Sequence, residues 1–202
     1  HNNINFYGNF ILNILNDLSK MEANPCNYYF LDYFSKMIYF NMSNFERYYL
    51  HNNVSLWYNQ YKPYCKNILI YFHGGGYFIG KPNMFVYICE KMYNDIGERC
   101  NINIFIMDYK KSPEYTYPTA IDESYDTYLK LIEENPDSNF YFYGESAGAH
   151  LLTQVVYKAI QNGKKIPKMI VNHSPWVMSN IGKIESEYDY ASKTHETTYL
   201  NN

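Results

Sequence analysis

Short apolar runs alternate with stretches of helical periodicity from residue 67 onward. Four runs have the length and the β-branched and aromatic content of buried strands: NILIYF (67–72), NINIFIMDY (101–109), NFYFY (139–143) and KMIVNHS (168–174). Between them, apolar residues stand three and four positions apart, first at Phe85, Ile88 and Met92, then at Ile121, Tyr125, Tyr128, Leu129 and Ile132. This alternation predicts an α/β fold with a mostly parallel sheet and helices on both faces.

The N-terminal part of the chain has a different pattern of apolar residues. Two amphipathic helices are predicted by apolar residues at helical spacing, Ile11, Ile14, Leu15 and Leu18 followed by Phe30, Phe34, Met37 and Ile38. We therefore interpret residues 1–50 as a helical, lid-like segment. Alternation at Val54, Leu56 and Tyr58 predicts a half-buried strand that leads into the first buried run.

Two helix boundaries are marked by single residues. Thr119 and Asp122 stand at the spacing of a capping box, which predicts a helix start there. Gly163 follows the last periodic residue of a later helix, which we expect to end near Asn162.

Length and charge restrict the classes of protein that remain. The 202 residues suit one domain, and a net charge of -3 offers no basic surface for nucleic acid. No run reaches the roughly 18 apolar residues of a membrane span, so a membrane anchor is expected only outside this chain. The four cysteines, Cys26, Cys65, Cys89 and Cys100, follow no metal or redox spacing, which favours free thiols, no metal site and no cofactor. Compartment and oligomeric state stay open, with cytoplasm or endoplasmic reticulum as the leading candidates.

Two glycine-rich motifs directly follow predicted strands. In Gly144-Glu145-Ser146-Ala147-Gly148 a strand precedes and a helix follows, which is the context of a nucleophile elbow that exposes a serine hydroxyl. In HGGGYFIG (73–80) consecutive glycines let backbone N–H groups turn toward a developing negative charge. We therefore expect an oxyanion hole formed by the N–H groups of Gly74, Gly75 and Ala147. The alternative, a phosphate-binding loop, is disfavoured because neither usual phosphate motif is present.

Together these motifs resemble a known family. HGGGYFIGKP, MDYKKSPEYTYPTAIDESYD (107–126), YGESAGAHL (143–151) and HSPW (173–176) resemble the hormone-sensitive-lipase-like branch of the α/β-hydrolase fold, which includes carboxylesterases, arylacetamide-deacetylase-like enzymes and steryl acetyl hydrolases. The resemblance covers roughly residues 54–180. It implies one α/β-hydrolase domain over residues 1–202, incomplete at its C-terminal end.

The resemblance also assigns roles to single residues. It implies Ser146 as nucleophile, with Glu145 standing where the family most often has aspartate. His73 and Gly76 would support the oxyanion loop, and Asp108, Tyr109, Pro113 and Glu114 would shape the loop beside the site. In that loop Lys110-Lys111-Ser112 replaces the usual Arg-Leu-Ala, so its detailed structure stays open.

A serine nucleophile needs a base, and in this fold the acid and the histidine follow the serine in the chain. His150 is one helical turn after Ser146 and is expected to point away from the substrate, in a packing role. His173 ends a strand, where the family implies a structural role. We therefore expect the acid and the histidine to lie beyond Asn202, which would leave this chain alone inactive. The remaining alternative uses His195 as base, oriented by Asp189 or Glu187.

These inferences predict a serine carboxylic-ester hydrolase that forms an acyl-enzyme on Ser146 and acts on a small apolar ester. A second interpretation is a catalytically inactive ligand-binding protein or gene fragment on the same scaffold, as in hormone receptors that this branch resembles. Function belongs to the site and not to the fold, so fold similarity does not separate the two.

Overall fold

The computed structural model describes residues 44–58 and 66–177. The strands are β1 (Phe45–Leu50), β2 (Asn53–Tyr58), β3 (Asn67–Phe72), β4 (Ile102–Met107), β5 (Asn139–Glu145) and β6 (Met169–His173). The helices are α3 (Val86–Met92), α4 (Glu98–Cys100), α5 (Thr119–Glu134) and α6 (Ala147–Gln161), with a 3-10 turn η1 (Pro82–Phe85) and a π turn η2 (Tyr93–Gly97) around α3. All four predicted strands are present, but β6 is exposed along its whole length among the described residues, because β5 is its one described neighbour in the sheet.

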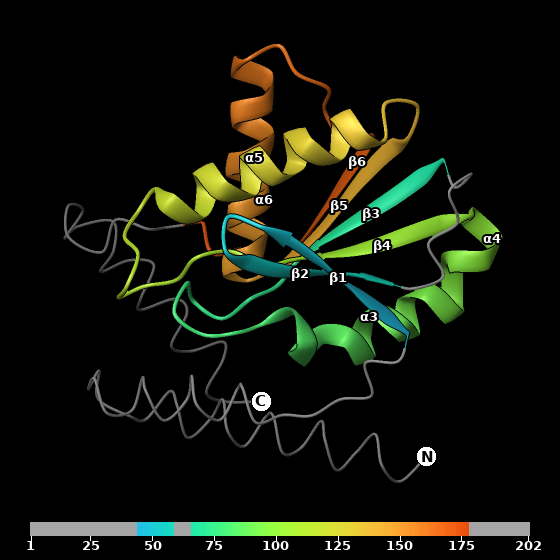
Figure 1. The fold of residues 1–202 in the computed structure, drawn as a ribbon, viewed down its shortest axis with the longest axis horizontal. Coiled ribbons are helices and arrows are strands. Elements are labelled where there is room, and N and C mark those ends of the chain that lie inside the picture. The colour runs from blue at the N-terminus through green and yellow to red at the C-terminus, as the bar shows by residue number, and fades with distance from the viewer. Residues whose placement is uncertain (1–43, 59–65, 178–202) are drawn as a thin grey trace, which may run out of the picture.

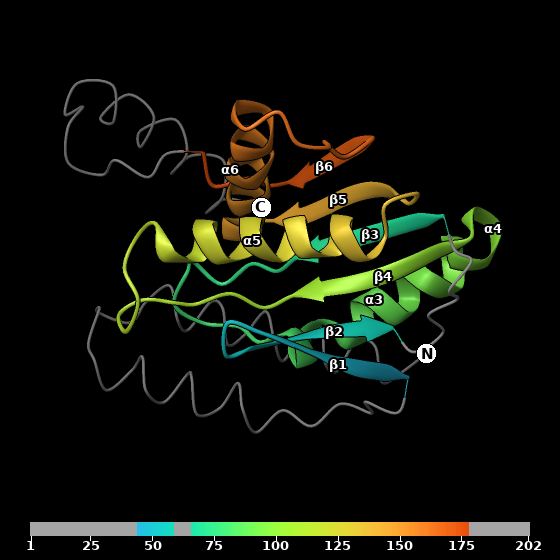
Figure 2. The same cartoon turned by 45° about the horizontal axis from the view of Figure 1, so that its top comes forward.

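The strands form one sheet in the order β1-β2-β4-β3-β5-β6. β4, β3, β5 and β6 are parallel, whereas β1 and β2 pair antiparallel with each other and β2 pairs antiparallel with β4. Helices α5 and α6 cover one face and α3 lies against the other (Figures 1 and 2). The predicted α/β architecture with a mostly parallel sheet and helices on both faces is confirmed.

Two apolar clusters hold the layers together, one on each face of the sheet. The cluster beneath α5 and α6 includes Ile68, Ile70, Phe72, Phe140 and Phe142. The cluster on the α3 face includes Leu69, Tyr71, Ile104, Ile106 and Cys89. Each such side chain contributes about 1.5–3 kcal/mol of hydrophobic stabilisation when it is fully buried. The alternation of the two sets along β3 explains why this strand is apolar throughout.

The interpretation of residues 1–50 as helical is wrong at its C-terminal end, because Phe45–Leu50 forms β1. His51 and Asn52 have φ of 52° and 59°, so a two-residue turn returns the chain directly into β2. The antiparallel pairing with β2 then fixes this segment as a strand, and the helical spacing that suggested the segment ends at Ile38. The two predicted helices within residues 1–43 lie outside the described residues.

Strand β2 is present as predicted, but it is not half-buried. Leu56 and Tyr58 belong to the cluster on the α3 face, and Trp57 belongs to the cluster on the other face. The reason is its position, since β2 has a hydrogen-bonded neighbour on each side and the sheet is covered on both faces there. The alternation of apolar residues in the sequence could not show that both faces of β2 are covered.

The capping box predicted at Thr119 and Asp122 is not formed. The N-cap position of α5 is Pro118, no side chain caps the helix, and Thr119 is already the first helical residue. The Asp122 carboxylate instead accepts a hydrogen bond from the Lys158 ammonium group on α6 at 2.6 Å. Helix α6 ends at Gln161, and Gly163 follows with φ of 59°, as expected for a helix C-terminus.

The register of the parallel strands brings the two glycine motifs together. Phe72, the last residue of β3, pairs with Gly144 in β5, so the segments that follow both strands emerge at the same edge of the sheet. Among the helices that the structure describes, none combines the length and apolar character needed to cross a bilayer.

Candidate active site

Ser146 occupies a strained turn between β5 and α6. Its φ is 52° and its ψ is -120°, a left-handed conformation that costs a non-glycine residue about 1–2 kcal/mol. The turn is fixed by backbone hydrogen bonds: the Ser146 N–H donates to His173 O at 3.0 Å, and its carbonyl accepts from the N–H groups of His150 at 3.2 Å and Trp176 at 3.1 Å. Ser146 is exposed at this bend.

The glycines of the elbow are required by close packing. A Cβ atom on Gly148 would overlap the carbonyl oxygens of Phe72 and His73, so α6 could not start where it does. A Cβ atom on Gly144 would lie 2.6 Å from Leu152 Cδ2, inside van der Waals contact. Small residues at both positions therefore let the helix approach the end of β3.

The structure places the glycine loop directly beside Ser146. A Cβ atom built on Gly74 would lie 3.4 Å from Ser146 Cβ and 3.2 Å from Glu145 O. Gly75 adopts φ of 125°, and its carbonyl accepts the N–H groups of Phe78 and Ile79, each at 3.1 Å, which closes the loop. Among the loop and cap hydrogen bonds of the described backbone, none has the N–H group of Gly74, Gly75 or Ala147 as its donor.

His73 is fully buried and supports this loop from behind. Its ring stacks on Phe85 and Tyr109, with centroids 5.0 and 4.5 Å away. The Nδ1–H donates to Gly74 O at 2.7 Å, and the Tyr109 hydroxyl donates to His73 O at 2.8 Å. Burial, reinforced by the nearby Lys111 charge, lowers the pKa of His73 to about 3. The ring is therefore neutral at ordinary pH and is held in place by its neighbours.

Asp108 lies at the centre of a buried ionic cluster behind the loop. Its carboxylate accepts the N–H groups of Val54 at 3.2 Å and Tyr109 at 3.0 Å, and the Lys111 ammonium at 2.9 Å. Lys81 lies 3.6 Å away. Burial raises the pKa of Asp108, but the charges of Lys111 and then Lys81 outweigh burial and hold the pKa below its ordinary value. Sequence reasoning missed both lysines as parts of this cluster.

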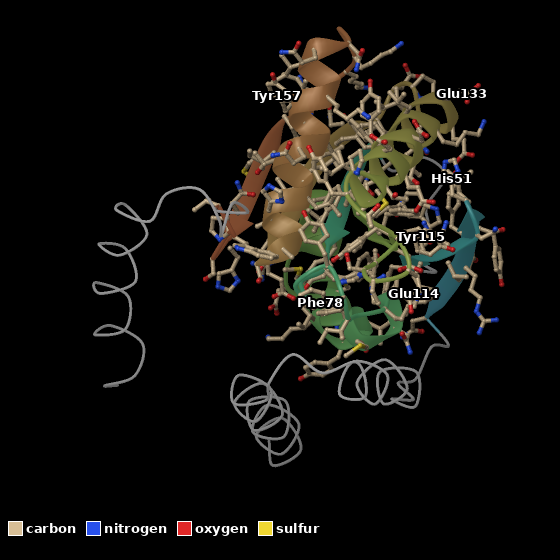
Figure 3. The ribbon with its side chains drawn as sticks, turned by 90° about the vertical axis from the view of Figure 1, so that its left-hand side faces the viewer. His51, Phe78, Glu114, Tyr115, Glu133 and Tyr157 are labelled. Atoms are coloured by element: carbon tan, nitrogen blue, oxygen red, sulfur yellow. The ribbon has the colours of Figure 1, made fainter. Side chains whose placement is uncertain are left out.

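The other residues expected to support the site, Glu145, Gly76 and Glu114, differ in how far they are buried and in what they contact. Glu145 accepts a hydrogen bond from the Tyr71 hydroxyl at 3.0 Å, which directs its carboxylate toward the α3 face of the sheet. Gly76, with φ of 62°, continues the glycine loop and borders a pocket. Glu114 is exposed in the loop before α5, at the same end of the molecule as Phe78 (Figure 3).

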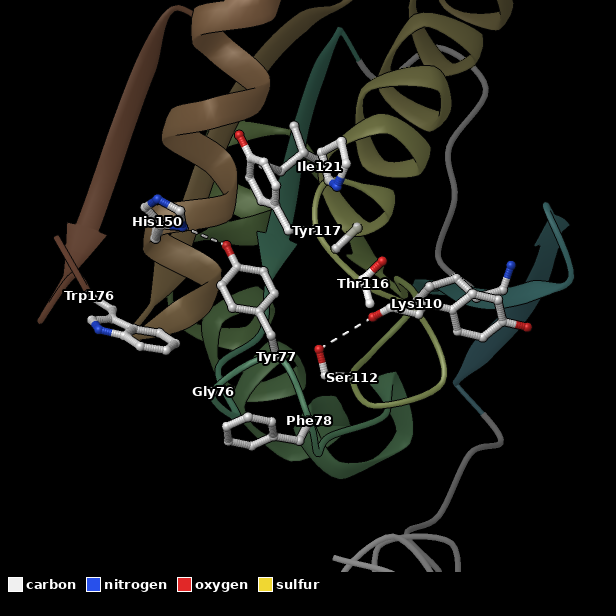
Figure 4. Close-up of a pocket in the computed structure, with 13 residues that line it drawn as sticks. Gly76, Tyr77, Phe78, Lys110, Ser112, Thr116, Tyr117, Ile121, His150 and Trp176 are labelled. Carbon is white, nitrogen blue, oxygen red and sulfur yellow. Dashed lines mark hydrogen bonds between the residues drawn. The ribbon is translucent and has the colours of Figure 1, made fainter. Parts of the chain in front are cut away.

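A pocket of about 230 Å³ lies beyond the glycine loop (Figure 4). His150 lines it, and its Nδ1 is hydrogen-bonded to the Tyr77 hydroxyl at 2.7 Å. His150 was expected to point away from the substrate in a packing role; its ring packs against Tyr77, and because the chain after Gly76 folds back over the first turn of α6, this side chain also borders the pocket. Trp176 also lines the pocket. Ser146 does not line it but adjoins it through its backbone bonds to these two residues.

No histidine among the described residues is hydrogen-bonded to the Ser146 hydroxyl. His73 and His150 are engaged as above, and the His173 ring pairs with the Tyr143 hydroxyl at 3.0 Å, in keeping with a structural role. His195, Glu187 and Asp189 lie outside the described residues.

The described histidine, cysteine and acidic side chains do not gather in threes as a metal site would require. Cys89 is a buried free thiol and Cys100 an exposed one, whereas Cys26 and Cys65 lie outside the described residues. The described part of the site therefore offers a serine, backbone donors and an apolar pocket.

Comparison with known proteins gives the family. The family described as alpha/beta hydrolase fold matches residues 69–201. The gibberellin receptor GID1B of Arabidopsis thaliana is 30% identical over 115 residues, covering 52% of this chain and 31% of the receptor. An acetyl-hydrolase of Streptomyces hygroscopicus is 28% identical over 109 residues, covering 54% of this chain and 35% of that protein.

Among solved structures, carboxyl esterase 2 from the fungus Tuber melanosporum superposes with a TM-score of 0.55 at 26% identity, covering 65% of this chain and 46% of that chain. The matched part of this chain spans about a third of the length of the two curated relatives. The family match includes both glycine motifs from β3 onward, and the fold agrees with it. The chain belongs to the alpha/beta hydrolase fold family, in its hormone-sensitive-lipase-like branch.

Proposed function

We propose that the protein is a serine hydrolase of carboxylic esters and that Ser146 is its nucleophile. The observation that carries this proposal is the pairing of an exposed, left-handed serine at a strand-to-helix turn with a glycine loop whose Gly74 adjoins it. A strained conformation persists only where the surrounding structure enforces it, and such residues concentrate at functional sites. The relatives named esterase and acetyl-hydrolase support the same reaction class.

In the proposed reaction, the Ser146 oxygen attacks the ester carbonyl carbon while its proton passes to a base. The carbonyl oxygen becomes an oxyanion, which accepts hydrogen bonds from the N–H groups of Gly74, Gly75 and Ala147. The positive end of the α6 dipole lies at the same point and favours this negative charge. Collapse of the intermediate releases the alcohol, which takes the proton, and leaves an acyl group on Ser146. Water then hydrolyses the acyl-enzyme.

The base and its orienting acid are proposed to come from outside residues 44–58 and 66–177. The described histidines are unsuited to the role. His73 is fully buried behind the loop, and its pKa of about 3 makes it a poor proton acceptor, while the His150 ring is bound to Tyr77. The His173 ring is paired with the Tyr143 hydroxyl, and His51 faces Asp126 at the turn between β1 and β2. Without a base, only the weaker catalysis of an oxyanion hole and substrate binding would remain.

The direct test measures hydrolysis of p-nitrophenyl acetate by the full-length protein and by its Ser146→Ala variant. We expect the variant to lose at least about a thousandfold in kcat/KM. Ser174→Ala is a matched control, because Ser174 also has a left-handed φ, of 46°, but lies one residue after β6. Equal rates for the Ser146→Ala variant and the unaltered protein would refute the proposal.

The receptor relative favours one second candidate, a ligand-binding protein without turnover. In that case the pocket beside Ser146 would bind its ligand in the same way in the Ser146→Ala variant, and neither protein would hydrolyse an ester. The two candidates therefore differ in one readout, the release of p-nitrophenolate.

A further inference from the structure

Aromatic side chains from three separate segments surround the pocket. Its aromatic lining comes from Tyr77, Phe78, Tyr115, Tyr117 and Trp176. Phe78, Tyr115 and Tyr117 are 50%, 45% and 81% exposed, so the structure leaves large apolar surfaces open around one concavity. Single exposed aromatics are ordinary, but a group of them that converges on a hollow is typical of a ligand site.

Several polar groups that line the pocket already have hydrogen-bond partners. The Tyr77 hydroxyl and His150 form a hydrogen bond, and the Ser112 hydroxyl donates to Tyr115 O at 3.3 Å (Figure 4). Lys110 is the one charged residue of the lining, and its ammonium is bound to Glu123 at 2.7 Å and to His51 O at 3.0 Å. The lining therefore offers no uncompensated charge to a ligand.

The state of His150 strengthens this conclusion. Burial lowers the pKa of His150 below its ordinary value, so the ring is neutral at pH 7. The Lys110 ammonium also lies over the Tyr115 ring, 4.5 Å from its centroid, and so holds one wall of the pocket in place. An anionic ligand would find its charge unpaired here and would lose its hydration without compensation.

The volume limits the size of the occupant. A dry apolar cavity of about 150 Å³ accommodates benzene. The present pocket, at about 230 Å³, is larger than that, but it is smaller than the roughly 300–1,000 Å³ of pockets that enclose a whole drug-sized ligand. It therefore fits one aromatic group of one or two rings and not a complete large substrate.

From these observations, we propose that the pocket is a subsite for an uncharged aromatic group of the ester substrate, bound between Tyr77, Tyr117 and Trp176 beside Ser146. That the aromatic group belongs to a substrate rests on the proposed ester hydrolysis. The binding of the aromatic group itself can be measured without turnover. Aromatic walls favour a flat ring over a saturated ring of the same size through stacked and edge-to-face contacts.

The binding test uses 2-naphthol as the probe and isothermal titration calorimetry as the measurement. We expect 2-naphthol to bind about tenfold more tightly than its saturated analogue decahydro-2-naphthol and more tightly than the anionic 2-naphthoate. Two variants fill the pocket, Ala120→Phe on α5 and Thr116→Trp in the exposed loop, and each should abolish binding. Ile160→Phe, on the exposed face of α6, is the matched control and should leave binding unchanged. Equal binding of the saturated analogue, or unchanged binding in both filled variants, would overturn the proposal.

A kinetic arm separates this subsite from the reaction itself. In the full-length protein, Ala120→Phe should lower kcat/KM for 2-naphthyl acetate at least about tenfold more than that for ethyl acetate. If both esters are hydrolysed and the variant slows them equally, the subsite proposal fails while the hydrolase proposal stands. If 2-naphthol binds but neither ester is hydrolysed, the aromatic site stands and the hydrolase proposal fails.

Discussion

Replacing Lys111 by methionine tests whether the buried ionic cluster holds the loop that precedes α5. The change keeps the aliphatic stem but removes the ammonium that lies 2.9 Å from the Asp108 carboxylate. Asp108 is only 3% exposed and would keep two backbone N–H donors and the more distant Lys81 at 3.6 Å. Removing one partner of a buried ion pair typically costs 3–5 kcal/mol, because the other charge stays buried. Since part of its pairing survives, we expect a loss of about 3 kcal/mol.

Thermal unfolding followed by circular dichroism measures this loss. For a domain of about 200 residues, 1 kcal/mol corresponds to roughly 2–4 °C in Tm, so Lys111→Met should lower Tm by roughly 6–12 °C at pH 7. Lys164→Met, which removes the same group from an exposed position, should change Tm by less than about 2 °C. The double variant Asp108→Asn, Lys111→Met should recover part of the loss, because no unpaired charge then remains.

The pH dependence gives a second check on the cause. The pKa of Asp108 is lower in the folded protein than in the unfolded chain, so its ionised form stabilises the fold. That contribution is present above the ordinary aspartate pKa of about 4 and is lost as the pH falls through the lower folded value. In Lys111→Met the folded pKa rises, so the stability difference from the unaltered protein should shrink below about pH 4. A Tm that falls by less than about 2 °C at pH 7, or a difference that is constant down to acid pH, would refute this account.

Three further substitutions test the loop and the elbow. Gly74→Ala keeps the backbone N–H but places a methyl group 3.4 Å from Ser146 Cβ and 3.2 Å from Glu145 O, so the serine or the loop must shift and kcat for p-nitrophenyl acetate should fall about 100-fold; full activity would count against the close approach of the loop to Ser146. Gly148→Ala overlaps the carbonyl oxygen at the end of β3, so we expect at least about 2 kcal/mol of destabilisation in urea unfolding, and a neutral effect would contradict the close packing. Tyr109→Phe removes the hydrogen bond to His73 O and should cost about 1 kcal/mol, measured in the same way; a stabilised variant would argue against the bracing role.

The parts of the fold that the sequence predicts are those in which one local signal decides the structure. The run at 67–72 is apolar and buried on both faces, and the run at 139–143 alternates buried and half-buried positions, and both patterns are typical of parallel strands. The elbow is predictable for a similar reason. Gly144 and Gly148 flank a turn whose crowding excludes side chains, so the sequence itself carries the requirement.

The parts that could not be predicted depend on strand pairing and burial, which the pattern of residue types does not show. β1 carries the exposed residues Glu46 and Arg47, and its pairing with β2 depends on the two-residue turn at His51 and Asn52. Lys111 looks like a surface lysine until the fold brings Asp108 to it behind the glycine loop. In each case the two partners are near in sequence, but their environment is set by the sheet and the loop around them, which local propensity does not describe.

The candidate site itself combines both kinds of information through the register of the sheet. Gly74 and Ser146 are 72 residues apart in the sequence, yet each follows a strand, and β3 and β5 pair in parallel so that Phe72 stands opposite Gly144. Two motifs that each follow a strand end must then meet at one edge, provided that their strands are neighbours. The same register carries Tyr77 onto His150, because the chain leaving the glycine loop passes over the helix leaving the elbow. The adjacent pocket is therefore a consequence of the arrangement that positions Ser146, and a change that shifts β3 against β5 should alter turnover and aromatic binding together.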